Sequence, residues 1–259
     1  MHHLVTLAAT LAYTIDGPIN APVLVLSNSL GTDHTLWDKQ LPAFAARFRV
    51  LRYDARGHGQ SSMPDGPYRI ADLGRDVLAL LDALGLGRVH FCGLSMGGLV
   101  GQWLALHAPE RLHRLVLCNT AAKIATAEAW NARIDQVQRE GLGSLCEGVA
   151  ARWFTPDFRA AQPAAAARVM EVFGRTPPAG YAACCAAVRD ADFRTRLAAV
   201  GTPTLVVAGA ADAATTVAEA TELQAAIPGA QLVVLEAAHL SNQEAACPFT
   251  AAVLGFLTA

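Results

Sequence analysis

Short, mainly apolar runs recur along the chain and predict buried strands. Each holds four or five residues, most of them are rich in Val and Leu, and none alternates regularly between apolar and polar positions. Such runs are typical of parallel-sheet strands that are covered on both faces. The six runs cover residues 23–27, 49–53, 89–92, 115–118, 205–208 and 232–235.

Helical patterns fall between several of these runs. From Asp72 to Leu84, apolar residues recur at i, i+4, i+7, i+8 and i+11, and Gly85 and Gly87 follow. Residues 98–107 predict an apolar helix that stops before Pro109. Strands that alternate with helices predict an α/β fold, with a mostly parallel central sheet flanked by helices.

The alternation breaks between about Thr120 and Val200. This stretch is rich in Ala and contains no clear strand, and Ala favours helix. The sequence therefore predicts a single α/β core made of residues 1–120 and 201–259. We expect residues 121–200 to form an inserted helical cap.

Composition narrows the functional classes. The 259 residues are 53% hydrophobic and 16% charged, with a net charge of −2. This composition argues against disorder, and it offers no electrostatic basis for binding nucleic acid or an anionic membrane. No apolar stretch reaches the roughly 18 to 20 residues that span a bilayer, and no basic residue opens the chain as in a signal peptide. We therefore expect a cytoplasmic protein.

The cysteines point to no metal or disulfide chemistry. Six are present, and none stands in a C-x-x-C or Cys/His metal-binding spacing. We expect reduced, buried thiols and neither a metal nor a cofactor. The sequence leaves the oligomeric state open.

The motif with the clearest chemical meaning is Gly93-Leu94-Ser95-Met96-Gly97, which has the G-x-S-x-G pattern. Between a strand and a helix, this pattern predicts a sharp turn that holds the serine in a strained backbone conformation. The two glycines leave room for the strand and helix backbones to approach closely. Ser95 is the candidate nucleophile, and we expect its side chain at a surface turn.

A serine nucleophile needs a base, and the base needs an acid to orient it. For a strand–turn–helix nucleophile the expected chain order is Ser, then acid, then His. Only His113 and His239 follow the predicted helix, and His113 opens a strand among arginines, which indicates a solvated position. His239 lies in a loop after the last strand and is the candidate base. Asp212 follows the preceding strand and a glycine turn, and it is the candidate acid.

Other acids fit less well. Some enzymes of this architecture take the acid one strand earlier, but the residue there is Asn119, which carries no charge. Asp190 and Asp192 fall inside the helical insertion, where we expect them to be solvated. Glu236 is too close in sequence to His239 to be its natural partner.

Two loops are expected to support the site. Residues 26–31 follow the first central strand, where such folds place an oxyanion loop, and the backbone N–H groups of Leu30 and Met96 are the candidate donors. Residues 54–61 follow the next strand and predict a tight structural loop. We assign His58 within it a mainly structural role.

These segments resemble the α/β-hydrolase family, and within that family they are similar to the 3-oxoadipate enol-lactonases of aromatic-compound degradation. The general likeness rests on the serine motif and on the loops that contain Asp212 and His239. The finer likeness covers nearly the whole chain. It rests on residues 26–32, 48–54, 118–122, 152–155 and 180–181.

The resemblance implies hydrolysis of a small lactone that carries a carboxylate, by a Ser-His-Asp acyl-enzyme mechanism without a cofactor. Trp130 and Arg133 lie about one helical turn apart and are candidates for binding the substrate, and so is Trp153, with Arg152 as an alternative. Packing within the cap, or a solvated arginine, explains each of these side chains equally well.

Alternative functions stay open within the same fold. A carboxylesterase, or a carbon–carbon bond hydrolase of a related degradative pathway, would use the same serine motif. A non-enzymatic ligand receptor is a different class, because fold does not determine function. The intact set of Ser95, Asp212 and His239 argues against the receptor.

Overall fold

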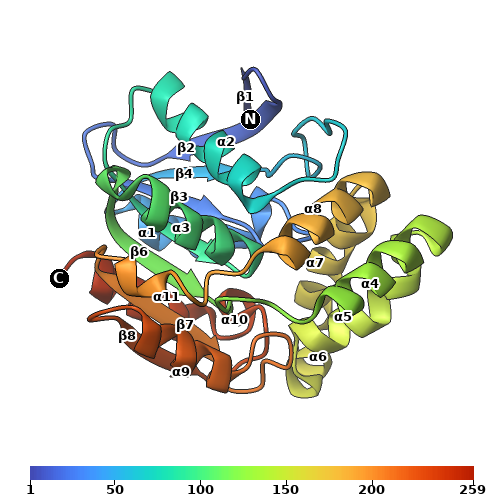
Figure 1. Ribbon diagram of the computed structural model, residues 1–259. Coiled ribbons are helices and arrows are strands. Elements are labelled where there is room, and N and C mark those ends of the chain that lie inside the picture. Colours follow the sequence, from blue (N-terminus) through green and yellow to red (C-terminus); the bar gives the residue numbers. More distant parts are fainter.

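An eight-stranded sheet forms the centre of the protein (Figure 1). The computed structural model describes residues 1–259. The strand order is β1-β2-β4-β3-β5-β6-β7-β8. β2 pairs antiparallel with both of its neighbours, β1 and β4. All other neighbouring strands are parallel. The strands are β1 (His2–Val5), β2 (Thr10–Asp16), β3 (Val23–Ser27), β4 (Arg49–Tyr53), β5 (Val89–Leu94), β6 (Leu112–Cys118), β7 (Thr204–Gly209) and β8 (Gln231–Leu235).

The six predicted strands are confirmed as β3 to β8. Every residue of β5 and of β7 is buried, as continuous apolar runs predict. β8 departs from this expectation because it lies at the edge of the sheet, where Val234 is exposed. The hairpin of β1 and β2 was not predicted, since its short strands carry no strong apolar run.

Helices cover both faces of the sheet. The crossovers through α2, α3 and α9 advance along the sheet in one direction, and the crossover through α1 runs in the other, so right-handed connections place α1 on the opposite face. α1 contacts α11, which packs against β7 and β8. These helices are α1 (Leu41–Ala45), α2 (Ile70–Ala83), α3 (Met96–His107), α9 (Val217–Ala226) and α11 (Ala246–Leu257).

Between β6 and β7 the chain forms helices and no strand. They gather at one side of the sheet, coloured yellow-green to orange in Figure 1. None of the protein's helices has the length and apolar character that crossing a membrane requires. The α-helices of this segment are α4 (Ala127–Glu140), α5 (Cys146–Trp153), α6 (Pro156–Ala161), α7 (Pro163–Arg175) and α8 (Pro178–Asp190).

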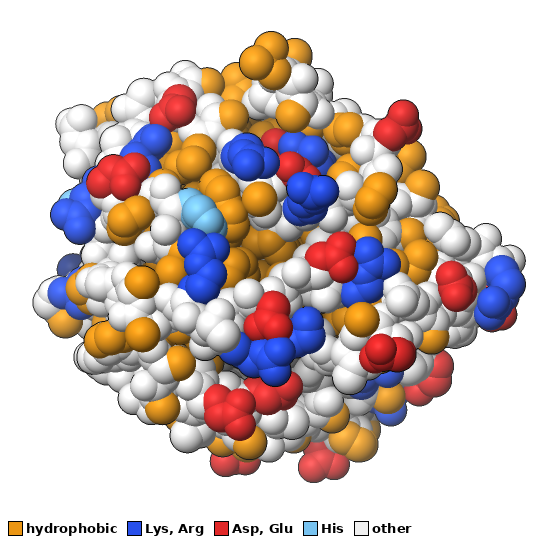
Figure 2. Space-filling view, in the orientation of Figure 1, with side chains coloured by type: hydrophobic (Ala, Val, Ile, Leu, Met, Phe, Trp, Pro, Cys, Tyr) orange, Lys and Arg blue, Asp and Glu red, His pale blue; other side chains and the backbone are white.

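The segment packs directly on the loops at the carboxyl ends of the strands. A Cβ added to Gly180 of α8 would lie 2.3 Å from the backbone oxygen of Gly57, so only glycine fits this contact. On the face shown in Figure 2, acidic and basic side chains are interspersed around a central apolar hollow. The cysteines are unpaired, and most are buried as expected, but Cys247 is exposed and Cys146 is partly exposed.

Candidate active site

The turn at Ser95 has the geometry that the motif predicts. Ser95 stands between the last residue of β5 and the first residue of α3, with φ 56° and ψ −110°, a conformation that non-glycine residues rarely adopt. A Cβ on Gly93 would lie 2.1 Å from the Gly97 oxygen, and a Cβ on Gly97 would lie 2.3 Å from the Ser27 oxygen. Both glycines are therefore required where strand and helix backbones meet.

The expected surface position of Ser95 is wrong. Its side chain is covered, and only 8% of the residue is exposed. Helices α4, α5 and α8 contribute walls above the turn, so the serine faces a cavity of about 230 Å³. The sequence pattern of the turn contains no information about this cover, which comes from a distant part of the chain.

His239 and Asp212 meet as a hydrogen-bonded pair. Asp212 lies in the turn after β7, and His239 lies in the loop after β8. The Nδ1 atom of His239 is 2.9 Å from Oδ2 of Asp212, and both side chains are at least 95% buried. His239 also lines the cavity with Ser95. Donation from Nδ1 leaves Nε2 as the ring nitrogen that can accept a proton.

Four further donors converge on Asp212. Oδ1 accepts from the backbone N–H groups of Ala214 (2.8 Å) and Thr215 (3.0 Å). Oδ2 accepts from the Thr215 hydroxyl (2.8 Å) and from Nδ2 of Asn119 (3.0 Å). Burial by itself raises the pKa of Asp212, but the charge of His239 and the hydrogen bonds outweigh it and lower the pKa to about 2. Asp212 is therefore a carboxylate at neutral pH.

Asn119 is the residue that sequence reasoning missed. It was set aside because it carries no charge, yet its amide binds Asp212, and its oxygen accepts from the Ser241 hydroxyl at 2.5 Å. Its φ is 46°, a left-handed conformation that Asn tolerates better than most residues. The signal was its position at the end of β6, between the ends of the strands that carry Ser95 and Asp212.

The loop after β3 is joined to the serine turn. The N–H of Gly97 donates to the Asn28 carbonyl at 3.1 Å. The Asn28 side chain donates to the Tyr53 carbonyl (2.7 Å) and accepts from the Trp37 indole (2.9 Å). These bonds anchor the start of the loop against β4 and the serine turn.

The N–H groups of Leu30 and Met96 donate to no protein atom, which leaves both of these candidate donors free. Leu30 also lines the cavity beside Ser95. Two unused backbone donors next to a strained serine suit an oxyanion that develops on an attacked carbonyl.

The cavity has an apolar wall and a cationic end. Ile124, Val149, Trp130 and Trp153 supply apolar surface. The indole N–H of Trp130 is already bonded to the Ile124 carbonyl at 2.7 Å, so this ring offers a ligand its face and edge rather than a donor. Both tryptophans, which the sequence indicated as candidates for substrate binding, therefore line the cavity that contains Ser95.

Arg133 and Arg152 both face this cavity. Arg133 donates to the Tyr181 hydroxyl at 3.3 Å and lies over the Trp130 ring, and neither arginine forms an ion pair with an acid. Burial, and then the positive charge of Arg133, lowers the pKa of Arg152 from its usual value. Two cations without an acid make this end of the cavity a favourable place for an anion.

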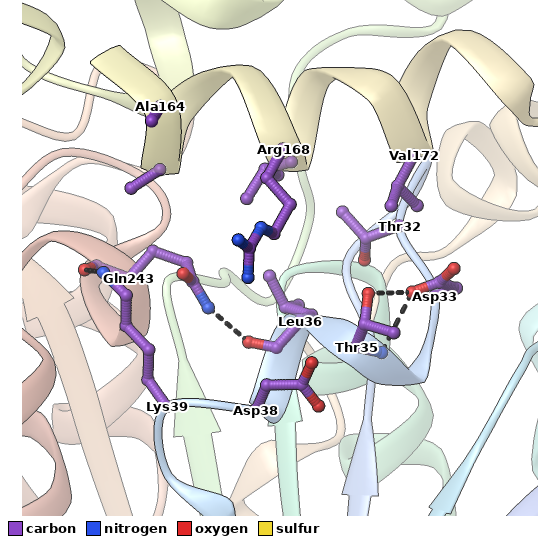
Figure 3. Close-up of a pocket in the computed structure, with 12 residues that line it drawn as sticks. Thr32, Asp33, Thr35, Leu36, Asp38, Lys39, Ala164, Arg168, Val172 and Gln243 are labelled. Atoms are coloured by element: carbon purple, nitrogen blue, oxygen red, sulfur yellow. Dashed lines mark hydrogen bonds between the residues drawn. The ribbon is translucent and has the colours of Figure 1, made fainter. Parts of the chain in front are cut away.

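A second cavity of about 230 Å³ lies beside the loop that follows β3 (Figure 3). It separates the segment around Leu36 from α7, and Arg168 of α7 points into it. Thr32 and Gln243 also line it, but neither Ser95 nor His239 does. This cavity therefore lacks the candidate nucleophile and the candidate base.

The sheet, the strained serine turn and the buried Asp–His pair together define an α/β hydrolase. The chain matches the family model described as the alpha/beta hydrolase fold over residues 22–155, and it belongs to that family. The predicted family and fold class are thereby confirmed.

The chain is similar to two relatives from Acinetobacter baylyi. One, 3-oxoadipate enol-lactonase 2, is 46% identical over 94% of this chain and 91% of its own length. The other, 3-oxoadipate enol-lactonase 1, is 42% identical over 96% and 93%. Among solved structures, the enol-lactonase from Burkholderia xenovorans LB400 superposes with a TM-score of 0.98 at 46% identity and covers all of both chains.

Proposed function

We propose that this protein hydrolyses 3-oxoadipate enol-lactone to 3-oxoadipate, a step in the breakdown of aromatic compounds. One observation carries the proposal: a single small cavity is lined by Ser95, by His239 and by two arginines without acidic partners. The lactone carbonyl of this substrate suits the end with Ser95 and His239, and its free carboxylate suits the end with the two arginines. The similarity to enol-lactonases over nearly the full chain supports the same substrate.

In the first step, the Ser95 oxygen attacks the lactone carbonyl while Nε2 of His239 takes the hydroxyl proton. Asp212 holds Nδ1–H, which selects the tautomer that leaves Nε2 free and stabilises the imidazolium that forms. The carbonyl oxygen becomes an oxyanion that Leu30 and Met96 N–H groups bind. Each such donor lowers the activation barrier by roughly 2.7 to 4 kcal/mol.

In the second step, the ring oxygen leaves as an enol, and the imidazolium of His239 supplies its proton. The product stays attached as an acyl ester of Ser95. Water, deprotonated by His239, then attacks this ester and releases the new carboxylate together with the serine hydroxyl. The enol finally converts to the ketone, so no cofactor is consumed.

In this proposal, the helices between β6 and β7 bind the parts of the substrate that do not react. Arg133 and Arg152 bind its carboxylate, while Trp130 and Trp153 contact the lactone ring. Residues 121–200 then act as a cap over the core, which consists of residues 1–120 and 201–259. Because the cap excludes water, the ion pair of substrate and arginine is stronger than it would be in solution.

The test is to follow lactone ring opening by ultraviolet absorbance with purified protein, next to simple aryl esters that lack a carboxylate. We expect kcat/KM for the enol-lactone to exceed that for the esters by at least 100-fold. Comparable values would instead indicate a general carboxylesterase. Cleavage of a carbon–carbon bond substrate in preference to the lactone would indicate the related class of hydrolase.

A further inference from the structure

The backbone of the oxyanion loop is held by a histidine that the mechanism above does not use. The N–H of Gly31 donates to Nε2 of His58 at 2.9 Å. His58 belongs to the loop after β4, and it is 1% exposed. Gly31 directly follows Leu30, whose N–H is one of the two candidate oxyanion donors.

The hydrogen bonds of His58 define its protonation state. Nε2 accepts a hydrogen bond, so it carries no proton, and Nδ1 points to the Arg56 carbonyl at 3.3 Å. Only the neutral ring can accept from Gly31. Burial lowers the pKa of His58, although the Arg56 carbonyl and the charges of Asp54 and Asp33 oppose this effect.

No other hydrogen bond replaces this contact. From Ser29 to Thr32, the bond from Gly31 to His58 is the one backbone hydrogen bond that leaves the turn. The remaining ones close the turn on itself, such as the Thr32 hydroxyl donating to the Ser29 carbonyl. The anchoring of Asn28 lies upstream of Leu30, and the next anchor after Gly31 is the His34 N–H bonded to Asp54, so His58 supplies the downstream anchor nearest to Leu30.

The loop borders the second cavity at Thr32 and packs against α7 at Gly31. A Cβ at Gly31 would lie 2.7 Å from the ring of Phe173, which also belongs to α7, so this part of the loop already packs closely against that helix. Without the His58 contact, the Gly31 amide would lose its one hydrogen-bond partner, and the adjacent Leu30 would be held less firmly.

We infer that His58 is a positioning residue for the reaction: by accepting the Gly31 N–H, it holds the loop so that the Leu30 N–H stays directed at the oxyanion. The inference rests on the proposed acyl-enzyme mechanism but not on the identity of the lactone. Misplacing a donor weakens its bond to the transition state more than to the ground state, so the effect falls on kcat.

The experiment compares His58→Asn with His58→Gln. The Gln side chain places an oxygen near the position of Nε2, whereas the shorter Asn side chain does not reach Gly31. We expect His58→Asn to lower kcat by about 10- to 100-fold with KM within about threefold, since loss of one such donor costs about 100- to 1,000-fold. His58→Gln should stay within about fivefold of the parent enzyme.

Both variants are measured with the enol-lactone and with p-nitrophenyl acetate, and urea unfolding gives the folded fraction. His34→Asn is the control, because His34 lies in the neighbouring segment, bonds to Asp54 and has no contact with Gly31. Its kcat should change less than twofold.

Unchanged kcat in folded His58→Asn would overturn the inference, as would equal losses in the Asn and Gln variants or an effect on KM alone. If the parent enzyme cleaves the acetate but not the lactone, the proposed substrate fails while the acetate series still decides the role of His58. A parent enzyme that cleaves neither overturns both.

Discussion

The α/β core and the helical segment between β6 and β7 contribute to the cavity in different ways. The core supplies Ser95, Asp212 and His239 from positions directly after strands, where the parallel sheet brings all carboxyl ends to one edge. The helical segment supplies Arg133 and Trp153 from helix faces. Backbone hydrogen bonding dictates the first set, and side-chain packing dictates the second.

Under the proposed function, this difference separates the residues that react from those that bind the rest of the substrate. Strand ends keep the same relative positions for as long as the sheet register holds, so a nucleophile and base placed there are robust. Helix faces shift with each packing change, so a binding wall built from them can change its ligand without disturbing the reacting groups. Substitutions in the two regions should therefore alter different kinetic constants.

The largest expected effect comes from Ser95→Ala. Without the hydroxyl no acyl-enzyme can form, and we expect kcat to fall by about 10⁴-fold or more. The free energy of unfolding should change by less than about 1 kcal/mol, because Ala retains the Cβ and the Ser95 hydroxyl makes no hydrogen bond in the structure. Steady-state assays and urea unfolding measure the two quantities. Lactone hydrolysis near the parent rate would reject Ser95 as the nucleophile.

Arg133→Ala tests the recognition side of the comparison. Hydrogen bonds to a charged group contribute about 1.5 to 3 kcal/mol, so we expect kcat/KM for the carboxylate-bearing lactone to fall about 10- to 100-fold, mainly through KM. For a neutral aryl ester the change should stay within threefold.

Arg168→Ala is the matched control for this prediction, since Arg168 lies on α7 and faces the second cavity (Figure 3). It should leave both substrates unaffected. Equal losses of the lactone and the ester in Arg133→Ala would show that this arginine does not bind the carboxylate. The same pair of substrates applied to Arg152→Ala then divides the binding between the two cations.

The smallest expected effect concerns the far end of the core. His90 of β5 packs between the rings of Phe48 and His113, and burial, followed by the charges of His113 and Arg114, lowers its pKa from 6.5 to about 4. Its Nδ1 atom is buried without a hydrogen-bond partner. The unfolded chain therefore takes up a proton at His90 at a higher pH than the folded chain.

Stability should consequently fall as the pH drops from about 6.5 towards 4. Between pH 7.5 and pH 5, His90 should account for a loss of about 2 kcal/mol in the free energy of unfolding. Urea unfolding of the parent and of His90→Asn at both pH values gives the difference. If the two proteins lose the same stability over this interval, His90 is not the source of the pH dependence.

Much of the core could be predicted because its signals are local. Apolar runs indicated β3 to β8, and the order Ser, acid, His along the chain singled out His239 and Asp212. The β1–β2 hairpin was not predicted, because its short strands carry no strong apolar run and β2 pairs with β4, which is distant in sequence. Asn119 was not identified as a site residue, because its amide acts only by donating a hydrogen bond to Asp212, and no local sequence pattern indicates that contact.

By itself, the sequence determined which residues stand at strand ends and which backbone conformation Ser95 must adopt, because glycine spacing and apolar periodicity act over a few residues. Only the tertiary structure decided what surrounds those groups. The burial of Ser95, the anchoring of Gly31 by His58 and the placement of Arg133 and Arg152 in the same cavity as Ser95 all depend on residues far apart in the chain. The physical reason is that such contacts depend on how the helices pack over the sheet, and packing is a property of the whole fold.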